Sequence, residues 1–141
     1  MAESNTPPAQ GVEQPKQTSI LVVEDDIFLR NLIIKKLMNE NYVIWDATDG
    51  TSALKVLETK KPHLILLDIL LPGIDGFEVL SLLKKNSELA QIPVIILSNL
   101  GSQDDIEKAM KLGATDYIIK ANFTLEEIAE RIKKILGEKY F

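Results

Sequence analysis

Residues 64–83 read LILLDILLPGIDGFEVLSLL, and this stretch decides the fold. It opens with a continuous apolar run at residues 64–67, which is typical of a strand buried on both faces of a parallel sheet. Pro72 and Gly73 then predict a turn. The apolar residues beyond the turn recur at helical spacing, at Val79, Leu80 and Leu83. The stretch is therefore expected to form one strand–loop–helix unit, with Asp68 at the carboxyl end of the strand.

The same alternation repeats along most of the chain. Four other short apolar runs, rich in β-branched residues, occupy residues 20–23, 42–45, 94–97 and 117–119. Segments with helical spacing follow them, and their apolar stripes are Leu29, Leu32, Ile33 and Leu37; Ala53, Leu54 and Leu57; Ile106, Ala109 and Met110; and Leu125, Ile128, Ala129, Ile132, Ile135 and Leu136. Five such units predict an α/β domain with a parallel sheet and helices on both faces.

Short polar signals predict where some of these helices begin and end. Thr124 followed by Glu127 is a capping-box pattern at the start of the last helix. Asp75 has a side chain that is preferred at a helix N-cap, and Gly113 stands where a helix C-cap is expected. These signals support the helical interpretation of the neighbouring stripes.

Composition bounds the class of protein. The 141 residues fit a single domain, and 45% hydrophobic with 26% charged residues is ordinary for a globular protein. A net charge of -5 argues against broad nucleic-acid binding, and the lack of cysteine excludes disulfides and thiolate chemistry. Residues 1–17 lack the apolar core of a signal peptide and are rich in Pro, Gln, Ser, Thr and Asn, so we interpret them as a disordered leader. We interpret residues 18–137 as the folded domain and residues 138–141 as a short tail. No apolar run is long enough to span a bilayer. A chain without cysteine suits the reducing cytoplasm, where we expect the protein.

Polar residues gather at the predicted carboxyl ends of the strands. They are Glu24, Asp25 and Asp26 after the first strand, Asp68 after the third, Ser98 after the fourth and Lys120 after the fifth. Ligands of open α/β sheets bind at this edge. Crowded carboxylates repel one another unless a cation holds them, and oxygen ligands of this kind suit Mg²⁺. A carboxylate can also attack phosphorus, so the pattern predicts Mg²⁺-dependent transfer of a phosphoryl group to Asp68.

Four ordered segments resemble the receiver domain of bacterial two-component response regulators, in particular its stand-alone, chemotaxis-type form. The segments are residues 21–26, 66–76, 94–98 and 113–120. Each is a weak signal alone, but their order makes the set specific. The resemblance covers roughly residues 19–136 and implies a single flavodoxin-like (βα)5 domain with a sheet of strand order 2-1-3-4-5.

The resemblance also implies the roles of the site residues. Asp68 is the expected phosphoacceptor. The expected ligands of Mg²⁺ are Asp68, Asp25 directly, Glu24 through water, and the backbone carbonyl of Leu70. Ser98 and Lys120 are expected to contact the phosphoryl group, and Tyr117 to turn inward when the domain is activated. Asp26 is the acid least expected to take part, since acidic residues are also favoured at a helix N-terminus.

The same resemblance implies the partners. A sensor histidine kinase or a phosphotransfer protein is the expected phosphodonor, and a downstream protein is expected to bind the face formed by the fourth helix, fifth strand and fifth helix. We expect no nucleic-acid or membrane partner, and either a monomer or a dimer that forms on phosphorylation. The chain would then be a phosphoacceptor that acts on itself, not an enzyme with turnover.

Ala121 departs from the family pattern, in which a proline usually follows the active-site lysine, often through a cis bond. A cis bond before a residue other than proline costs about 3–4 kcal/mol. We therefore expect a trans bond between Lys120 and Ala121, or else a strained cis bond, and with it a changed position for Lys120.

Asn99 is a second departure, since the residue after the switch hydroxyl is usually small in this family and controls access to the phosphoryl group. We expect Asn99 to alter the lifetime of the phosphoryl group. Comparing the dephosphorylation rates of the wild type and an Asn99→Ala variant would test this, and equal rates would contradict it.

Three other functions compete with this interpretation. A phosphatase of the haloacid-dehalogenase type would carry its nucleophile after the first strand in an Asp-x-Asp pattern, which residues 24–26 do not form. A flavin carrier would need a loop of Ser, Thr and Gly after that strand, where an acidic loop would repel a phosphate. A receiver-like interaction module that works without phosphorylation is the strongest rival, because Asn99 and Ala121 depart from the usual pattern.

Overall fold

The computed structural model describes residues 17–140, so most of the predicted leader lies outside the described residues. The elements in chain order are β1 (Ser19–Val23), α1 (Ile27–Asn39), β2 (Val43–Ala47), α2 (Gly50–Thr59), β3 (Leu64–Leu67), α3 (Gly76–Lys85), β4 (Val94–Ser98), α4 (Gln103–Leu112), β5 (Asp116–Ile119), a short 3-10 helix η1 (Lys120–Asn122) and α5 (Leu125–Tyr140). Among these residues, no helix combines the length and the apolar character needed to cross a membrane.

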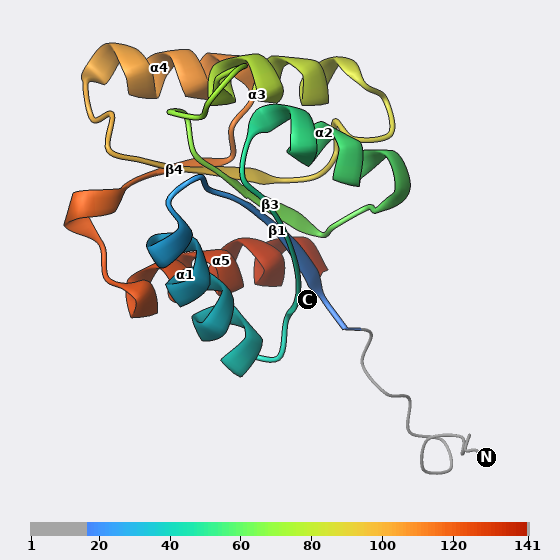
Figure 1. Ribbon diagram of the computed structural model, residues 1–141, viewed down its shortest axis with the longest axis vertical. Coiled ribbons are helices and arrows are strands. Elements are labelled where there is room, and N and C mark those ends of the chain that lie inside the picture. The colour runs from blue at the N-terminus through green and yellow to red at the C-terminus, as the bar shows by residue number, and fades with distance from the viewer. Residues whose placement is uncertain (1–16, 141) are drawn as a thin grey trace.

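The sheet confirms the predicted topology. Its five strands are parallel and follow the order β2-β1-β3-β4-β5. Figure 1 shows α1 and α5 on one face of the sheet, and α2, α3 and α4 on the other. After β1 the chain adds β2 on one side of the sheet and then β3, β4 and β5 on the other side. The boundary between β1 and β3 is therefore the topological switch point, where flavodoxin-like folds place their ligands.

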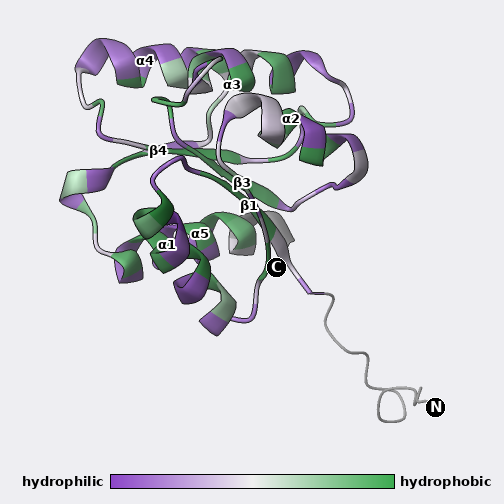
Figure 2. Cartoon of the chain, viewed as in Figure 1, coloured by the Kyte–Doolittle hydropathy of each residue, from purple (hydrophilic) through white to green (hydrophobic). Residues whose placement is uncertain are grey.

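The core forms two layers because the central strands bury both of their faces. Leu21, Val23, Ile65 and Leu67 face the layer under α2, α3 and α4, while alternate residues such as Ile20 and Leu66 face the layer under α1 and α5. Figure 2 shows β3 and β4 in hydrophobic colours and much of α4 in hydrophilic ones. Each fully buried Leu or Ile stabilises the fold by roughly 1.5–3 kcal/mol.

Two details of the prediction were wrong. The second strand was expected at residues 42–45 but runs from Val43 to Ala47, because its pairing with β1 continues past the apolar run to the pair of Val23 with Ala47. Leu32 and Met110 were expected in the core, yet they are 38% and 44% exposed. Residues next to a buried stripe point about 100° away from their neighbours on a helix, so apolar type alone did not place these two.

The predicted caps agree with the structure. The Asp75 side chain accepts a hydrogen bond from the Glu78 amide at the start of α3. Thr124 and Glu127 exchange side-chain to backbone bonds of 2.9 and 3.1 Å, as a capping box does. Gly113 ends α4 in the left-handed conformation with φ of 110°, which glycine adopts without strain.

Gly76 ties the first turn of α3 to the backbone that carries Asp68. Its amide donates to the Ile69 carbonyl at 2.8 Å. A methyl group at this position would collide with the backbone carbonyl oxygen of Asp68 and with Ile69 Cα. Only glycine therefore allows the helix to start this close to the end of β3.

Candidate acidic site

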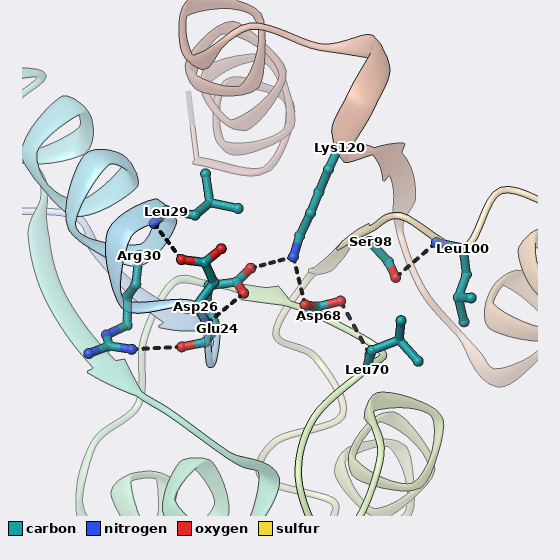
Figure 3. Close-up of polar contacts among 9 residues, drawn as sticks. All are labelled: Glu24, Asp26, Leu29, Arg30, Asp68, Leu70, Ser98, Leu100 and Lys120. Carbon is teal, nitrogen blue, oxygen red and sulfur yellow. Dashed lines mark hydrogen bonds and ion pairs between the residues drawn. The ribbon is translucent and has the colours of Figure 1, made fainter.

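Four strands deliver polar side chains to one edge of the sheet. Val23 and Leu67 are paired partners on β1 and β3, so the residues after them, Glu24 and Asp68, lie side by side. The Asp68 amide also donates to the Val23 carbonyl at 3.1 Å. Lys120 follows β5 and reaches across to both acids, as Figure 3 shows.

Lys120 joins two buried carboxylates. Its Nζ lies 2.8 Å from Glu24 Oε1 and 2.7 Å from Asp68 Oδ2. The side chains of Glu24, Asp68 and Lys120 are 3%, 4% and 15% exposed, so water screens these charges weakly. The sequence predicted that Lys120 would serve the site, and the structure brings its ammonium group directly onto the predicted phosphoacceptor.

The pKa values of Glu24 and Lys120 are both raised, for different reasons. Burial raises the pKa of Glu24, and this outweighs the opposing effect of the neighbouring Lys120 ammonium group. Burial alone would lower the pKa of Lys120, but the hydrogen bond to Asp68 and the negative charges of Asp68 and Glu24 outweigh it, so that pKa is raised. Lys120 therefore stays charged at neutral pH and holds the carboxylates together.

A third carboxylate gives the site the donor set of a divalent cation. Carboxylate oxygens of Glu24, Asp25 and Asp68 all lie within 4.8 Å of one another. Lys120 supplies one positive charge against three carboxylates, which leaves two negative charges when all three are ionised. Among the side chains that the structure describes, Glu24 Oε1 is the one buried oxygen or nitrogen atom without a hydrogen bond of good geometry, although it pairs electrostatically with Lys120. The residues present fit a hard divalent cation such as Mg²⁺.

Asp26 has a different task from its two acidic neighbours. It is the N-cap of α1, and its Oδ1 accepts a hydrogen bond from the Leu29 amide at 3.1 Å. Its own amide donates to Glu24 Oε2 at 3.0 Å. The carboxylate of Asp26 thus starts the helix, in agreement with the expectation that it is the acid least involved in the site.

The predicted switch residues lie on the β4–β5 side of the site. Ser98 ends β4 with no exposed surface, and its Oγ accepts from the Leu100 amide at 3.3 Å. The half-buried Tyr117 donates its hydroxyl hydrogen to the Leu100 carbonyl. Asn99, between the two contacts, is exposed. The β4–α4 loop is thereby linked to both predicted switch residues.

Leu70 and Ala121 complete the predicted set. The Leu70 amide donates to Asp68 Oδ1 at 3.3 Å, which fixes the loop that carries the predicted carbonyl ligand. The bond between Lys120 and Ala121 is trans, as expected, and the chain enters the helix η1 at Lys120. Lys120 reaches the site without the usual proline after it, since the Lys120 ammonium group contacts both Glu24 and Asp68.

The sequence interpretation missed Arg30 and Asp46. Arg30 Nη1 donates to the Glu24 carbonyl at 2.9 Å, and Arg30 Nε donates to Asp46 Oδ2 at 3.1 Å. The available signal was an acid at the carboxyl end of β2, which neighbours β1, combined with an arginine one turn into α1. Asp46 was passed over because the residues around it are not distinctive.

Fold and site together define a flavodoxin-like α/β protein with an acidic site at the switch point of its sheet. The family model for the response regulator receiver domain matches residues 20–133. The chain therefore belongs to the receiver domains of two-component response regulators, as the resemblance in sequence implied.

Known relatives agree with this assignment. The chain is 36% identical over 120 residues to sporulation initiation phosphotransferase F of Bacillus subtilis, which covers 85% of this chain and 94% of that protein. It is 37% identical over 117 residues to the protein named "Probable transcriptional regulator ycf27" of Cyanophora paradoxa, covering 83% of this chain and 47% of that relative. It thus spans about half the length of that relative. The Mn²⁺-bound form of response regulator Rcp1 aligns with a TM-score of 0.74 and 29% identity over 85% of this chain and 92% of Rcp1.

Proposed function

We propose that Asp68 accepts a phosphoryl group from the phosphohistidine of a sensor histidine kinase or phosphotransfer protein, in a reaction that requires Mg²⁺, and that the chain acts in the cytoplasm. The observation that carries this proposal is the convergence of three carboxylates within 4.8 Å, with Lys120 Nζ 2.7 Å from Asp68. Receiver domains interact with histidine kinases or phosphotransfer proteins, and the chain belongs to that family.

The transfer is a substitution at phosphorus. An Asp68 carboxylate oxygen forms a bond to phosphorus while the P–N bond of the donor histidine breaks, and the electron pair returns to the imidazole. When bound at Glu24, Asp25 and Asp68, Mg²⁺ would neutralise charge that develops on the phosphoryl oxygens. The product is an acyl phosphate on Asp68, so the chain is changed by the reaction and is a phosphoacceptor, not a turnover enzyme.

Lys120 is the residue whose contacts must change during this reaction. Its ammonium group now covers Asp68, whose side chain is only 4% exposed. The ammonium group can exchange a carboxylate oxygen for a phosphoryl oxygen without losing a charged partner. Ser98, which ends the neighbouring strand β4, would donate its hydroxyl hydrogen to a second phosphoryl oxygen.

The new charge would then reach the β4–α4 loop. Ser98 Oγ accepts from the Leu100 amide, and Tyr117 donates to the Leu100 carbonyl, so one loop residue responds to both switch residues. A hydroxyl that turns toward the phosphoryl group would release the Leu100 amide. Such a release would bias the loop between two states and change the face of α4, β5 and α5 for a downstream protein.

The surface beside the acids suits a protein phosphodonor. Ile27 and Phe28 follow the acidic loop directly and are 63% and 75% exposed, and Leu70 on the β3–α3 loop is 55% exposed. Large apolar side chains exposed around a functional site commonly mark a protein contact. We propose that the phosphodonor covers them as it presents its histidine to Asp68.

Intact-mass spectrometry after incubation with acetyl phosphate tests this function. We expect a single phosphoryl adduct on the wild type in the presence of Mg²⁺, and none when Mg²⁺ is chelated. An Asp68→Asn variant should give no adduct in either condition, because an amide is a far weaker nucleophile than a carboxylate. The matched control is Asp75→Asn, which changes an acid on the same loop whose side chain caps α3.

Two outcomes would contradict the proposal. An adduct that persists in Asp68→Asn would place the phosphoacceptor elsewhere. The lack of any adduct on the wild type, together with no binding of a phosphoryl mimic, would favour the rival in which the fold serves as an interaction module without phosphorylation.

A further inference from the structure

Arg30 links three elements at the rim of the acidic site. It belongs to α1, donates through Nη1 to the Glu24 carbonyl in the β1–α1 loop at 2.9 Å, and donates through Nε to Asp46 on β2 at 3.1 Å. Figure 3 shows the guanidinium group beside the Glu24 backbone. Its side chain is only 11% exposed, which is low for an arginine. Such placement indicates a group whose position is fixed by its contacts.

The carbonyl that Arg30 holds belongs to the peptide group between Glu24 and Asp25. Because a peptide group is planar, fixing its oxygen fixes the direction in which the chain continues to Asp25. The Glu24 amide is bound on the other side to the Ala47 carbonyl of β2 at 3.1 Å. The backbone amide and the backbone carbonyl of Glu24 are therefore both held in place. Both are anchored to β2, the amide directly and the carbonyl through Arg30, which is bound to Asp46.

The chemistry of arginine suits this task better than that of other cations. The guanidinium group carries donors in a planar fork, so it binds two acceptors at a fixed angle, whereas a lysine ammonium acts as a point charge. Both bonds of Arg30 are charge-assisted, and such bonds are roughly twice as strong as neutral ones. Its charge is directed at Asp46 and at a carbonyl, and Lys120 supplies the ion pair to Asp68.

We propose that Arg30 is a positioning residue of the acidic site: it holds the Glu24–Asp25 peptide group against the end of β2 and thereby keeps the Glu24 and Asp25 carboxylates together for a divalent cation. The inference rests on the proposed function in that it takes the site to bind such a cation. Arg30 acts through the loop and touches neither the cation nor the phosphoryl group.

The sign of the effect on cation binding separates positioning from simple charge. Removing a positive charge near a cation site would by itself strengthen cation binding, because like charges repel. Positioning predicts the reverse. Loss of a group that orients metal ligands typically weakens binding about 10–100-fold. A purely structural role predicts lower stability with unchanged affinity for the cation.

The test is a titration of the unphosphorylated full chain with Mn²⁺, followed by the electron paramagnetic resonance signal of the free ion. We expect Arg30→Met to weaken Mn²⁺ binding about tenfold. Arg30→Lys should lie between Arg30→Met and the wild type, because it keeps the charge but loses the fork. Arg30→Gln, which removes the charge but keeps a planar amide donor, should also weaken binding although the loss of positive charge alone would strengthen it. It carries the test together with Arg30→Lys if Arg30→Met does not fold.

Arg131→Met is the matched control. Arg131 also pairs with an acid, Asp116, and stacks on the Phe123 ring, but it belongs to α5, and both of these partners lie outside the acidic loop. This variant should lose stability in urea while binding Mn²⁺ as the wild type does. Wild-type affinity in Arg30→Met, or tighter binding, would overturn the inference alone. A wild-type chain that binds no Mn²⁺ would overturn it together with the metal requirement of the proposed function.

Discussion

A Lys120→Met variant should be less stable than the wild type by about 3 kcal/mol at about pH 7.5, and the loss should shrink toward acidic pH. Lys120 is the ion-pair partner of two carboxylates whose side chains are 3% and 4% exposed. Removing one partner of a buried ion pair leaves uncompensated charge in a poorly solvated place. Here it leaves two such charges, with Asp25 adding a third at the rim.

The direction of the pH dependence follows from the pKa shifts. The pKa of Glu24 is raised, chiefly by burial, and Lys120 opposes that rise. Without Lys120 the pKa of Glu24 should rise further. A carboxyl group whose pKa is raised in the folded state favours folding below its unfolded value, near 4.5, and this contribution is lost as the pH rises through the folded value. The variant should therefore regain part of its lost stability as the pH falls from neutrality toward the unfolded pKa of Glu24.

The wild type should instead lose stability in the alkaline range. The raised pKa of Lys120 means that its ion pairs contribute fully below the unfolded value of 10.5 and are lost as the pH rises through the folded value. The Lys120→Met variant lacks this loss. The two proteins should therefore differ least at the acidic and alkaline ends and most near neutrality.

Urea unfolding across this pH range, in the presence of a chelator, measures the effect. Lys133→Met is the matched control, because it removes the same charge from an exposed position on α5 and should change stability by less than about 0.5 kcal/mol. Equal free energies of unfolding in the two variants at every pH would show that the ion pairs of Lys120 do not hold the acids together.

The positions of the site residues could be predicted because the apolar runs in the sequence mark both where the strands lie and where they end. The runs at residues 20–23, 64–67 and 94–97 are apolar on both faces, and each stops at a polar residue. Parallel strands end at the same edge, so Glu24, Asp68 and Ser98 had to meet there. The rules for connections between parallel strands, together with the order of the receiver-like segments, were then sufficient to predict the strand order of the sheet.

What could not be predicted depends on the direction of single side chains. The sequence gives no sign that Lys120 bridges Glu24 as well as Asp68, because this depends on how far η1 turns the chain after β5. The link from Arg30 to Asp46 depends on the register of α1 against β2. Leu32 was predicted to lie in the core because it is apolar. In the structure its neighbour Ile33 is buried, and Leu32, one position away on the helix, faces outward.

Adjacent acids in the β1–α1 loop should respond to substitution with opposite signs. Asp25→Asn should weaken divalent-cation binding at least about tenfold, since it removes a charged ligand, and should stabilise the cation-free protein by about 1 kcal/mol, since it relieves repulsion among three carboxylates. Asp26→Ala should destabilise the protein by about 1 kcal/mol through the lost cap of α1, with unchanged affinity for the cation.

Urea unfolding with Mg²⁺ and with a chelator separates the two roles, because a ligand that binds only the folded state stabilises it in proportion to the logarithm of its concentration over Kd. The wild type and Asp26→Ala should gain the same stability from Mg²⁺, and Asp25→Asn should gain far less. Asp26→Asn is the control for the cap, because asparagine caps helices as well as aspartate does. An undiminished gain in Asp25→Asn would show that Asp25 is not a ligand of the metal site. The site would then consist of the buried Glu24 and Asp68, whose two negative charges Lys120 offsets by one, so a net charge of only -1 would remain to hold the cation.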